Sequence, residues 1–176
     1  MRLVTRSSLI LAVMLALSLA LPACNSEEGN ILEQVTGSGK VGTRKVRFPS
    51  QILGLAVKKE DVSAQLQEVK QPYVDSLGIF SMREGELLRA TLQASRMNRV
   101  ARPNSKEFRD AIINLMGSSE PEEISVNDVA VFNTTGNRQD IFAWFVGKNF
   151  YVLSVHDDYL FPRTLLRRTI ELGKEL

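Results

Sequence analysis

The chain has a single cysteine, Cys24, among its 176 residues. No intramolecular disulfide can form, so any fold has to be held together by packing of apolar side chains. The roughly 130 residues beyond position 44 show a periodic pattern of apolar side chains, and a domain of that size can bury a substantial core. The sequence therefore predicts one packed domain over residues 45–176, without disulfide support.

The first 23 residues have the pattern of an export signal. Arg2 and Arg6 are the only charged residues there, and an apolar stretch runs from Leu9 to Leu21. That order of a positive start and a short apolar segment is typical of a signal peptide. Without residues 1–23, Lys+Arg falls from 22 to 20 and equals the 20 Asp+Glu. A neutral mature chain gives no reason to expect nucleic-acid binding.

The segment Leu21-Pro22-Ala23-Cys24 resembles the lipobox of bacterial lipoproteins, with an aliphatic residue at −3, a small residue at −1 and cysteine at +1. The resemblance implies cleavage after Ala23 and lipidation of Cys24. The protein would then be anchored to the cell membrane, on the extracytoplasmic side, through that lipid. Ordinary secretion and an uncleaved membrane anchor are the alternatives, the second because residues 7–26 are uncharged.

Residues 24–44 are polar and rich in glycine, which is typical of a flexible tether. A tether of about 20 residues has an r.m.s. reach of roughly 25 Å. The predicted organisation is therefore a signal peptide over 1–23, a lipidated cysteine and tether over 24–44, and a single domain over 45–176.

The periodicity beyond residue 44 predicts an α+β domain. It contains a largely antiparallel sheet of about five to six strands packed with three helices, in the order β-α-β-β-α-β-β-β-α. The expected strands are at residues 45–48, 79–82, 87–97, 125–133, 139–146 and 150–155. The expected helices begin near Asp61, near Asn104 and at Pro162.

Two of these strands carry further information. Residues 87–97 alternate apolar and polar side chains, with Gln93 and Ser95 on the polar face, which indicates a strand with one face in water. Residues 141–146 are apolar throughout, which indicates an interior strand with both faces covered.

The predicted domain loosely resembles small α/β/α domains of the PsbP/Mog1 type. The segments at residues 54–57, 91–93 and 144–147 are also similar to an uncharacterised actinobacterial family of secreted proteins. These resemblances imply a fold and an extracytoplasmic setting. They imply no reaction.

The residues that carry chemistry do not form a catalytic motif. His156 is the only histidine and is followed by Asp157 and Asp158. Zinc sites use three or four protein ligands, and a second histidine is absent, so no metal or other cofactor is expected. A carboxylate calcium site or a Ser-His-Asp arrangement stays open, but a polar loop between the last strand and the last helix is the preferred interpretation.

Aromatic and basic side chains provide two further candidates. Trp144 and Phe145 are expected to pack as core, or to form a ligand or partner patch with Phe108 and Ile112. Arg163, Arg167 and Arg168 give the last helix a basic face that either is solvated or meets lipid headgroups.

Three functions are consistent with this sequence. The favoured one is a non-catalytic module that binds a protein or another component of the cell envelope. The second is a carrier or sensor of an apolar ligand or lipid held in a cavity between sheet and helices. The third is an envelope enzyme, which requires His156 or paired acids to converge in a cleft.

Overall fold

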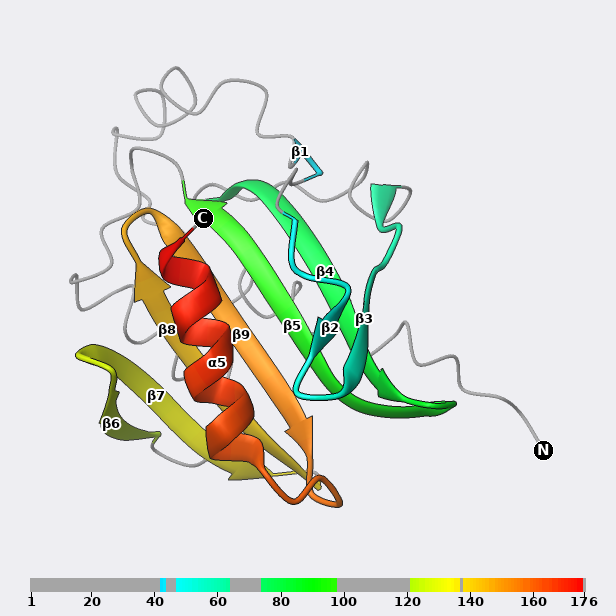
Figure 1. Cartoon of the computed structure of the whole chain (residues 1–176). Helices are drawn as coiled ribbons and strands as arrows, with labels where there is room; N and C mark the ends of the chain where they lie inside the picture. Colours follow the sequence, from blue (N-terminus) through cyan, green and yellow to red (C-terminus); the bar gives the residue numbers. More distant parts are fainter. Residues whose placement is uncertain (1–41, 44–46, 64–73, 98–120, 137, 176) are drawn as a thin grey trace, which may run out of the picture.

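The computed structural model describes residues 42–43, 47–63, 74–97, 121–136 and 138–175. In that part of the chain, nine strands form one sheet and one complete helix lies across it (Figure 1). The elements are β1 (Gly42–Thr43), β2 (Gln51–Ile52), β3 (Leu55–Lys59), β4 (Val74–Glu84), β5 (Leu87–Met97), β6 (Glu122–Val126), β7 (Val129–Gly136), β8 (Gln139–Val146), β9 (Asn149–His156) and α5 (Pro162–Lys174).

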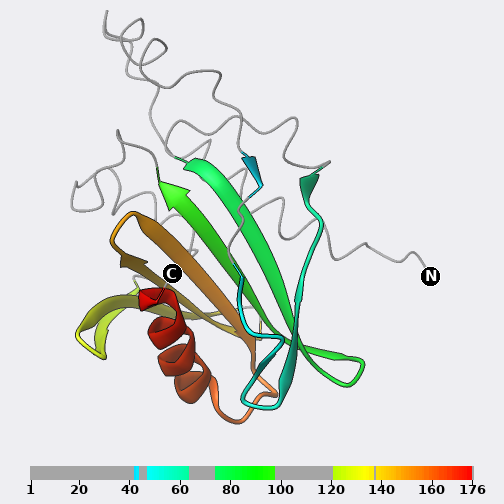
Figure 2. The same cartoon turned by 45° about the horizontal axis from the view of Figure 1, so that its top comes forward.

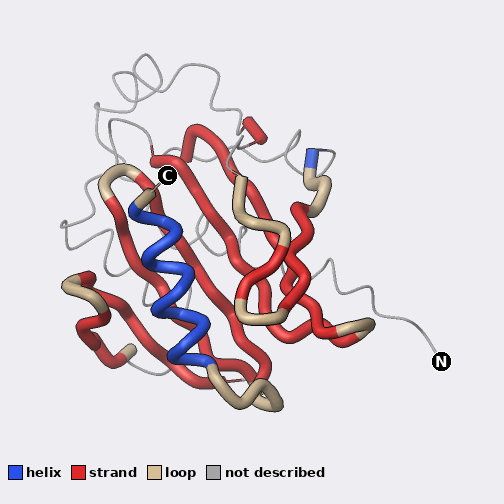
Figure 3. Tube along the Cα trace, in the orientation of Figure 1, coloured by secondary structure: helices blue, strands red, loops and turns tan. Residues whose placement is uncertain are grey.

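Eight of the strands form a continuous antiparallel path in the order β2-β3-β4-β5-β9-β8-β7-β6. Strands β6 to β9 follow one another as a meander, and β9 then pairs with β5. The short strand β1 pairs in parallel with β4, where Gly42 lies beside Ser76. Figure 3 shows how far strands dominate this part of the molecule.

The main core lies between the sheet and α5. Leu165, Leu166 and Ile170 follow helical spacing and are completely buried. They belong to one apolar cluster with Trp144 and Tyr151, whose rings stack at a centroid distance of 5.4 Å. Figures 1 and 2 show α5 lying across β8 and β9. The helix begins at Pro162 as predicted, because proline is well suited to the first position of a helix.

The opposite face of the sheet carries a second apolar cluster. It contains Phe132, Ala143, Phe150 and Val152, all buried. Strand β8 contributes to both clusters, since Phe142 and Trp144 belong to the α5 side and Ala143 to the other. The prediction that residues 141–146 form an interior strand is therefore confirmed, and both of its faces are fully covered at Phe142, Ala143 and Trp144.

The predicted fold class is wrong. The described residues form nine strands and one complete helix, rather than five to six strands with three helices. The helix predicted near Asn104 and most of the one predicted near Asp61 lie outside the described residues. Apart from the short parallel strand β1, the extra strands come from two-residue hairpins. Residues 125–133, predicted as one strand, lie in β6 and β7, which are joined by a turn at Asn127 and Asp128.

The second unpredicted hairpin is β2–β3, with Leu53 and Gly54 as its turn. Of the strand predicted at residues 45–48, the structure describes only residues 47 and 48, and these two do not form a strand. Phe48 lies in a loop there and packs edge-on against Phe80 at 4.8 Å. The predicted wet face of β5 is also wrong at two positions. Gln93 and Ser95 are buried, and the Gln93 amide nitrogen donates a hydrogen bond to the Ser95 hydroxyl at 3.3 Å.

Candidate functional site

Strand register brings three connections to one end of the sheet. Ala56, just after the β2–β3 turn, pairs with Arg83, just before the β4–β5 turn. On the other side of β5, Ala90 pairs with Val155, next to the last residue of β9. The β2–β3 turn, the β4–β5 turn and the β9–α5 loop therefore lie at the same end, as Figures 1 and 2 show. We call this end, from these three connections, the turn end.

The turn end carries every large apolar side chain that is strongly exposed in the described part of the chain. Leu53 is 48% exposed, Leu87 57%, Leu160 82% and Phe161 60%. We call these four side chains the apolar tips. Single exposed apolar residues are common on protein surfaces, but a set gathered at one end is characteristic of an interaction site.

The energy available from the apolar tips can be estimated from their exposure. Removing a leucine or phenylalanine side chain from water is worth about 1.5–3 kcal/mol when it is fully buried. Scaled by the exposed fractions, complete coverage of all four side chains would contribute roughly 4–7 kcal/mol before any cost of association. That is enough for a weak contact.

Leu53 occupies a backbone conformation that leucine rarely adopts. Its φ angle is 49°, and Gly54 follows with a φ angle of 81°. A two-residue turn with both φ angles positive is the type I′ hairpin turn, for which Asn-Gly is the preferred sequence. The left-handed conformation costs a residue with a Cβ atom about 1–2 kcal/mol. The turn joins the buried residues Ile52 and Leu55, so the strain is that of a tight hairpin whose exposed corner is a leucine.

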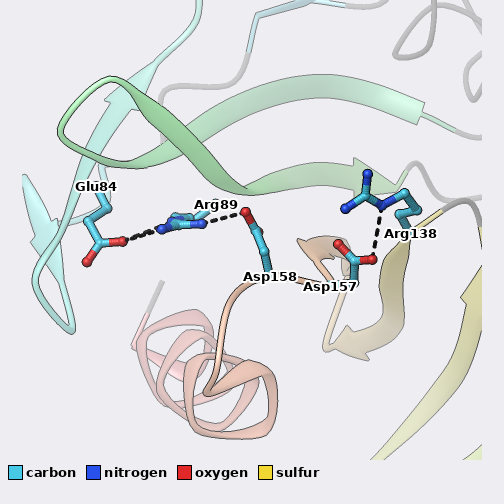
Figure 4. A network of polar contacts seen from close by, with 5 residues as sticks. All are labelled: Glu84, Arg89, Arg138, Asp157 and Asp158. Carbon is cyan, nitrogen blue, oxygen red and sulfur yellow. Dashed lines mark hydrogen bonds and ion pairs between the residues drawn. The ribbon is translucent and has the colours of Figure 1, made fainter.

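Ion pairs connect two of the three segments that carry the apolar tips, the β4–β5 hairpin and the β9–α5 loop (Figure 4). The Arg89 guanidinium on β5 lies 2.8 Å from the Glu84 carboxylate on β4 and 2.6 Å from the Asp158 carboxylate in the β9–α5 loop. Its side chain is only 16% exposed. The hydrogen bond to Glu84 is the main cause that raises the pKa of Arg89, and the Asp158 charge adds to it. Arg89 therefore ties the β9–α5 loop to the β4–β5 hairpin.

The β9–α5 loop is fixed at further points. The Asp157 carboxylate accepts a hydrogen bond from the Arg138 guanidinium at 3.1 Å (Figure 4). The Tyr159 amide donates to the His156 carbonyl at 3.0 Å, and the Tyr159 ring meets Phe161 edge-on at 6.3 Å. Burial raises the pKa of the Tyr159 hydroxyl, and the nearby Glu84 charge raises it further. These contacts hold the backbone of the loop in place, so Leu160 and Phe161 project from an ordered segment.

Two of the three candidate metal-binding or catalytic residues form ion pairs. His156 ends β9, and Asp157 and Asp158 follow it in the polar loop that the sequence predicted. Both carboxylates form ion pairs with arginines. Among the described residues, no three His, Cys, Asp or Glu side chains gather closely enough to hold a metal ion. This arrangement organises the loop that follows β9.

The residues of the predicted aromatic patch are separated. Trp144 is fully buried in the cluster under α5, whereas Phe145 packs against Phe150 in the cluster on the other face, at a centroid distance of 4.6 Å. The structure therefore does not bring these two side chains together. Phe108 and Ile112 lie outside the described residues, and so do Ala23 and Cys24.

The basic face of α5 is partly paired. Arg168 lies 2.9 Å from Glu171, one turn along the same helix, while Arg163 and Arg167 are exposed. This pairing is that of a solvated helix face. The basic face therefore gives no separate reason to place α5 against a membrane.

Sequence reasoning missed the turn end as a site. Leu53 and Leu87 lie in different hairpins, and an apolar residue in a sequence is ordinarily interpreted as core. The pair Leu160-Phe161 gave the one available signal, because it stands in a polar loop directly before Pro162. The gathering of all four residues depends on strand register, which a single sequence does not specify.

No family model, no curated protein and no solved structure matches this chain. Within the part that the structure describes, no helix combines the length and the apolar composition needed to cross a bilayer. The resemblances to a lipobox and to PsbP/Mog1-type domains stay predictions.

Proposed function

We propose that this chain is a lipid-anchored, extracytoplasmic protein of the cell envelope. Its folded part is a non-catalytic interaction module that uses the turn end as its contact surface. The observation that carries the proposal is the gathering of Leu53, Leu87, Leu160 and Phe161 at one end of the sheet.

The ion pairs support binding as the role of this end. Arg89 holds the β4–β5 hairpin and the β9–α5 loop together, so the loop that carries Leu160 and Phe161 is ordered before any contact is made. Ordering the surface in advance lowers the entropy cost of binding. Asp157 and Asp158, the carboxylates that directly follow His156, are engaged by Arg138 and Arg89, which favours a binding module over an enzyme.

The anchor is supported by the sequence. Cys24 is the only cysteine, follows a segment with the pattern of an export signal, and is not needed for a disulfide. A lipid on Cys24 would keep the module at a membrane surface for the lifetime of the protein, because two or more acyl chains give stable anchoring.

The contact surface can be tested by hydroxyl-radical labelling of the full chain. Labelling in isolated cell membranes is compared with labelling of the same chain synthesised in a membrane-free extract. We expect Leu87, Leu160 and Phe161 to be labelled several-fold less in membranes. Lys148, exposed in the β8–β9 turn at the other end of the sheet, is the internal control and should react equally in both samples.

Equal labelling of the apolar tips in both samples would contradict the proposal, because the surface would then be uncovered where the protein works. A uniform decrease that includes Lys148 would also contradict it, because the membrane would then shield the whole domain rather than one end.

A further inference from the structure

The partner that covers the turn end can be inferred from where the anchored segment joins the sheet. Gly42 pairs with Ser76 near the start of β4, whereas the β4–β5 turn follows Glu84. At 3.3–3.4 Å per strand residue, these two levels are about 26 Å apart. The chain from Cys24 therefore enters the sheet at the end opposite the apolar tips.

The length of the predicted tether fits this separation. Residues 24–41 comprise 18 residues, and a flexible glycine-rich chain of that length has an r.m.s. end-to-end distance of roughly 21–25 Å. A linker gives the highest effective concentration when its r.m.s. length matches the distance it has to span. When the turn end touches the membrane that holds Cys24, Gly42 lies about 26 Å above the surface. The predicted tether has about the length needed to join Cys24 in the membrane to Gly42 at that height.

The apolar tips suit a tethered contact with a bilayer. They are four side chains on three separate connections in the described part of the chain, and by themselves they support only a weak contact. A weak contact is enough for a tethered domain, because a contact with a millimolar dissociation constant is half occupied at the millimolar effective concentration that a short tether provides.

The charges of the turn end leave apolar contact as its attraction for a bilayer. Glu84 and Asp158 share Arg89, and Asp157 is paired with Arg138, so these three acids and two arginines carry a net charge of −1, to which the exposed Glu86 adds another. The two arginines are already engaged, so apolar contact has to outweigh the repulsion between these acids and anionic headgroups.

We propose that the turn end rests on the bilayer that holds Cys24, with Leu53, Leu87, Leu160 and Phe161 in its interfacial layer. This inference rests on the proposed lipid anchor and adds the partner and the orientation of the domain. Leucine and phenylalanine on projecting turns are side chains that enter the boundary between headgroups and acyl chains.

Site-specific photo-crosslinking of the full chain in its own membrane tests this proposal. A diazirine amino acid is introduced by codon suppression at position 160, at position 87 or, as a control, at position 148 in the opposite turn. After irradiation, intact-mass spectrometry identifies what each position has captured. We expect a phospholipid mass on the chains labelled at 160 and 87, and none on the chain labelled at 148.

A second variant tests whether the tips act together. In a chain with the probe at 87, Leu160→Ser combined with Phe161→Ser should reduce the phospholipid adduct roughly tenfold, since two of the four tips are lost. Lys148→Ser in the same background should leave the adduct unchanged. Both sites are strongly exposed, so neither variant should impair folding.

Each other outcome overturns the inference. A protein mass at 160, including a second copy of this chain, would show that the turn end binds a protein. Equal phospholipid adducts at 160 and 148 would show that the domain has no preferred orientation, and no adduct would show an uncovered surface. The same spectra report whether Cys24 carries lipid, so failure of the anchor is distinguished from failure of the orientation.

Discussion

Replacing Leu53 with asparagine separates a role in the fold from a role at the surface. Leu53 begins the β2–β3 turn at a φ angle of 49° and is 48% exposed. Asparagine is the residue other than glycine that best tolerates this conformation, and Leu53→Asn converts the turn to the preferred Asn-Gly sequence.

Two opposing effects determine the change in the free energy of unfolding. About half of the Leu53 surface is covered, so losing the side chain removes about half of the 1.5–3 kcal/mol that full burial would contribute. Relief of the left-handed strain returns up to about 1–2 kcal/mol. The two effects nearly cancel, and we expect stability to change by less than about 1 kcal/mol.

Leu55→Asn is the matched control, two residues along the chain. Leu55 is only 2% exposed, and the same substitution there removes a packed side chain and buries an amide, so we expect a loss of about 3 kcal/mol or more. Urea unfolding of both variants measures the difference. If Leu53→Asn also cost more than about 2 kcal/mol, Leu53 would be a packing residue and the interpretation of its strain would be refuted.

Three further predictions concern the fold. Gly147→Ala should cost about 1–2 kcal/mol because the φ angle of Gly147 is 58°, although a new Cβ there would meet no neighbouring atom. Gly136 is equally uncrowded but lacks a positive φ angle, so Gly136→Ala should be neutral or stabilise the fold by about 0.4–1 kcal/mol. Denaturant midpoints measure both changes in stability. Leu166→Ala should lose about 2–5 kcal/mol in the same assay because this side chain of α5 is fully buried between the helix and the sheet, and a loss below 1 kcal/mol would contradict the packing of that helix. The pKa of Tyr159 is raised in the folded state, so its contribution is complete below about pH 10 and is lost as the pH rises through the folded pKa; unfolding curves across that range should fall less steeply for Tyr159→Phe than for the unmodified chain, and parallel curves would refute the assignment.

The sequence predicted those elements whose side-chain period is unambiguous. The apolar run at residues 141–146 marked the interior strand β8, and Pro162 marked the start of α5. The period of the strand at residues 87–97 was also correct. The prediction that one face of this strand is in water was wrong, because Gln93 and Ser95 are buried. Alternation within one strand does not reveal what covers its polar face.

Hairpins with two-residue turns escaped prediction. Asn127 and Asp128 both adopt positive φ angles, and this pair is a turn signal that was overlooked because apolar residues continue on both sides of it. The β2–β3 turn is harder still to predict from the sequence, because leucine is seldom found at a turn position with a positive φ angle. The turn end was missed for a related reason: its residues come from three connections that only strand pairing brings together.

The central claim is that this domain works at a membrane surface to which Cys24 holds it. The most direct test is the mass of the N-terminal peptide from the protein extracted from its own membrane. We predict a peptide that begins at Cys24 and carries a diacylglyceryl group, usually with a further acyl chain. A peptide that retains residues 1–23, or an unmodified Cys24, would contradict the claim.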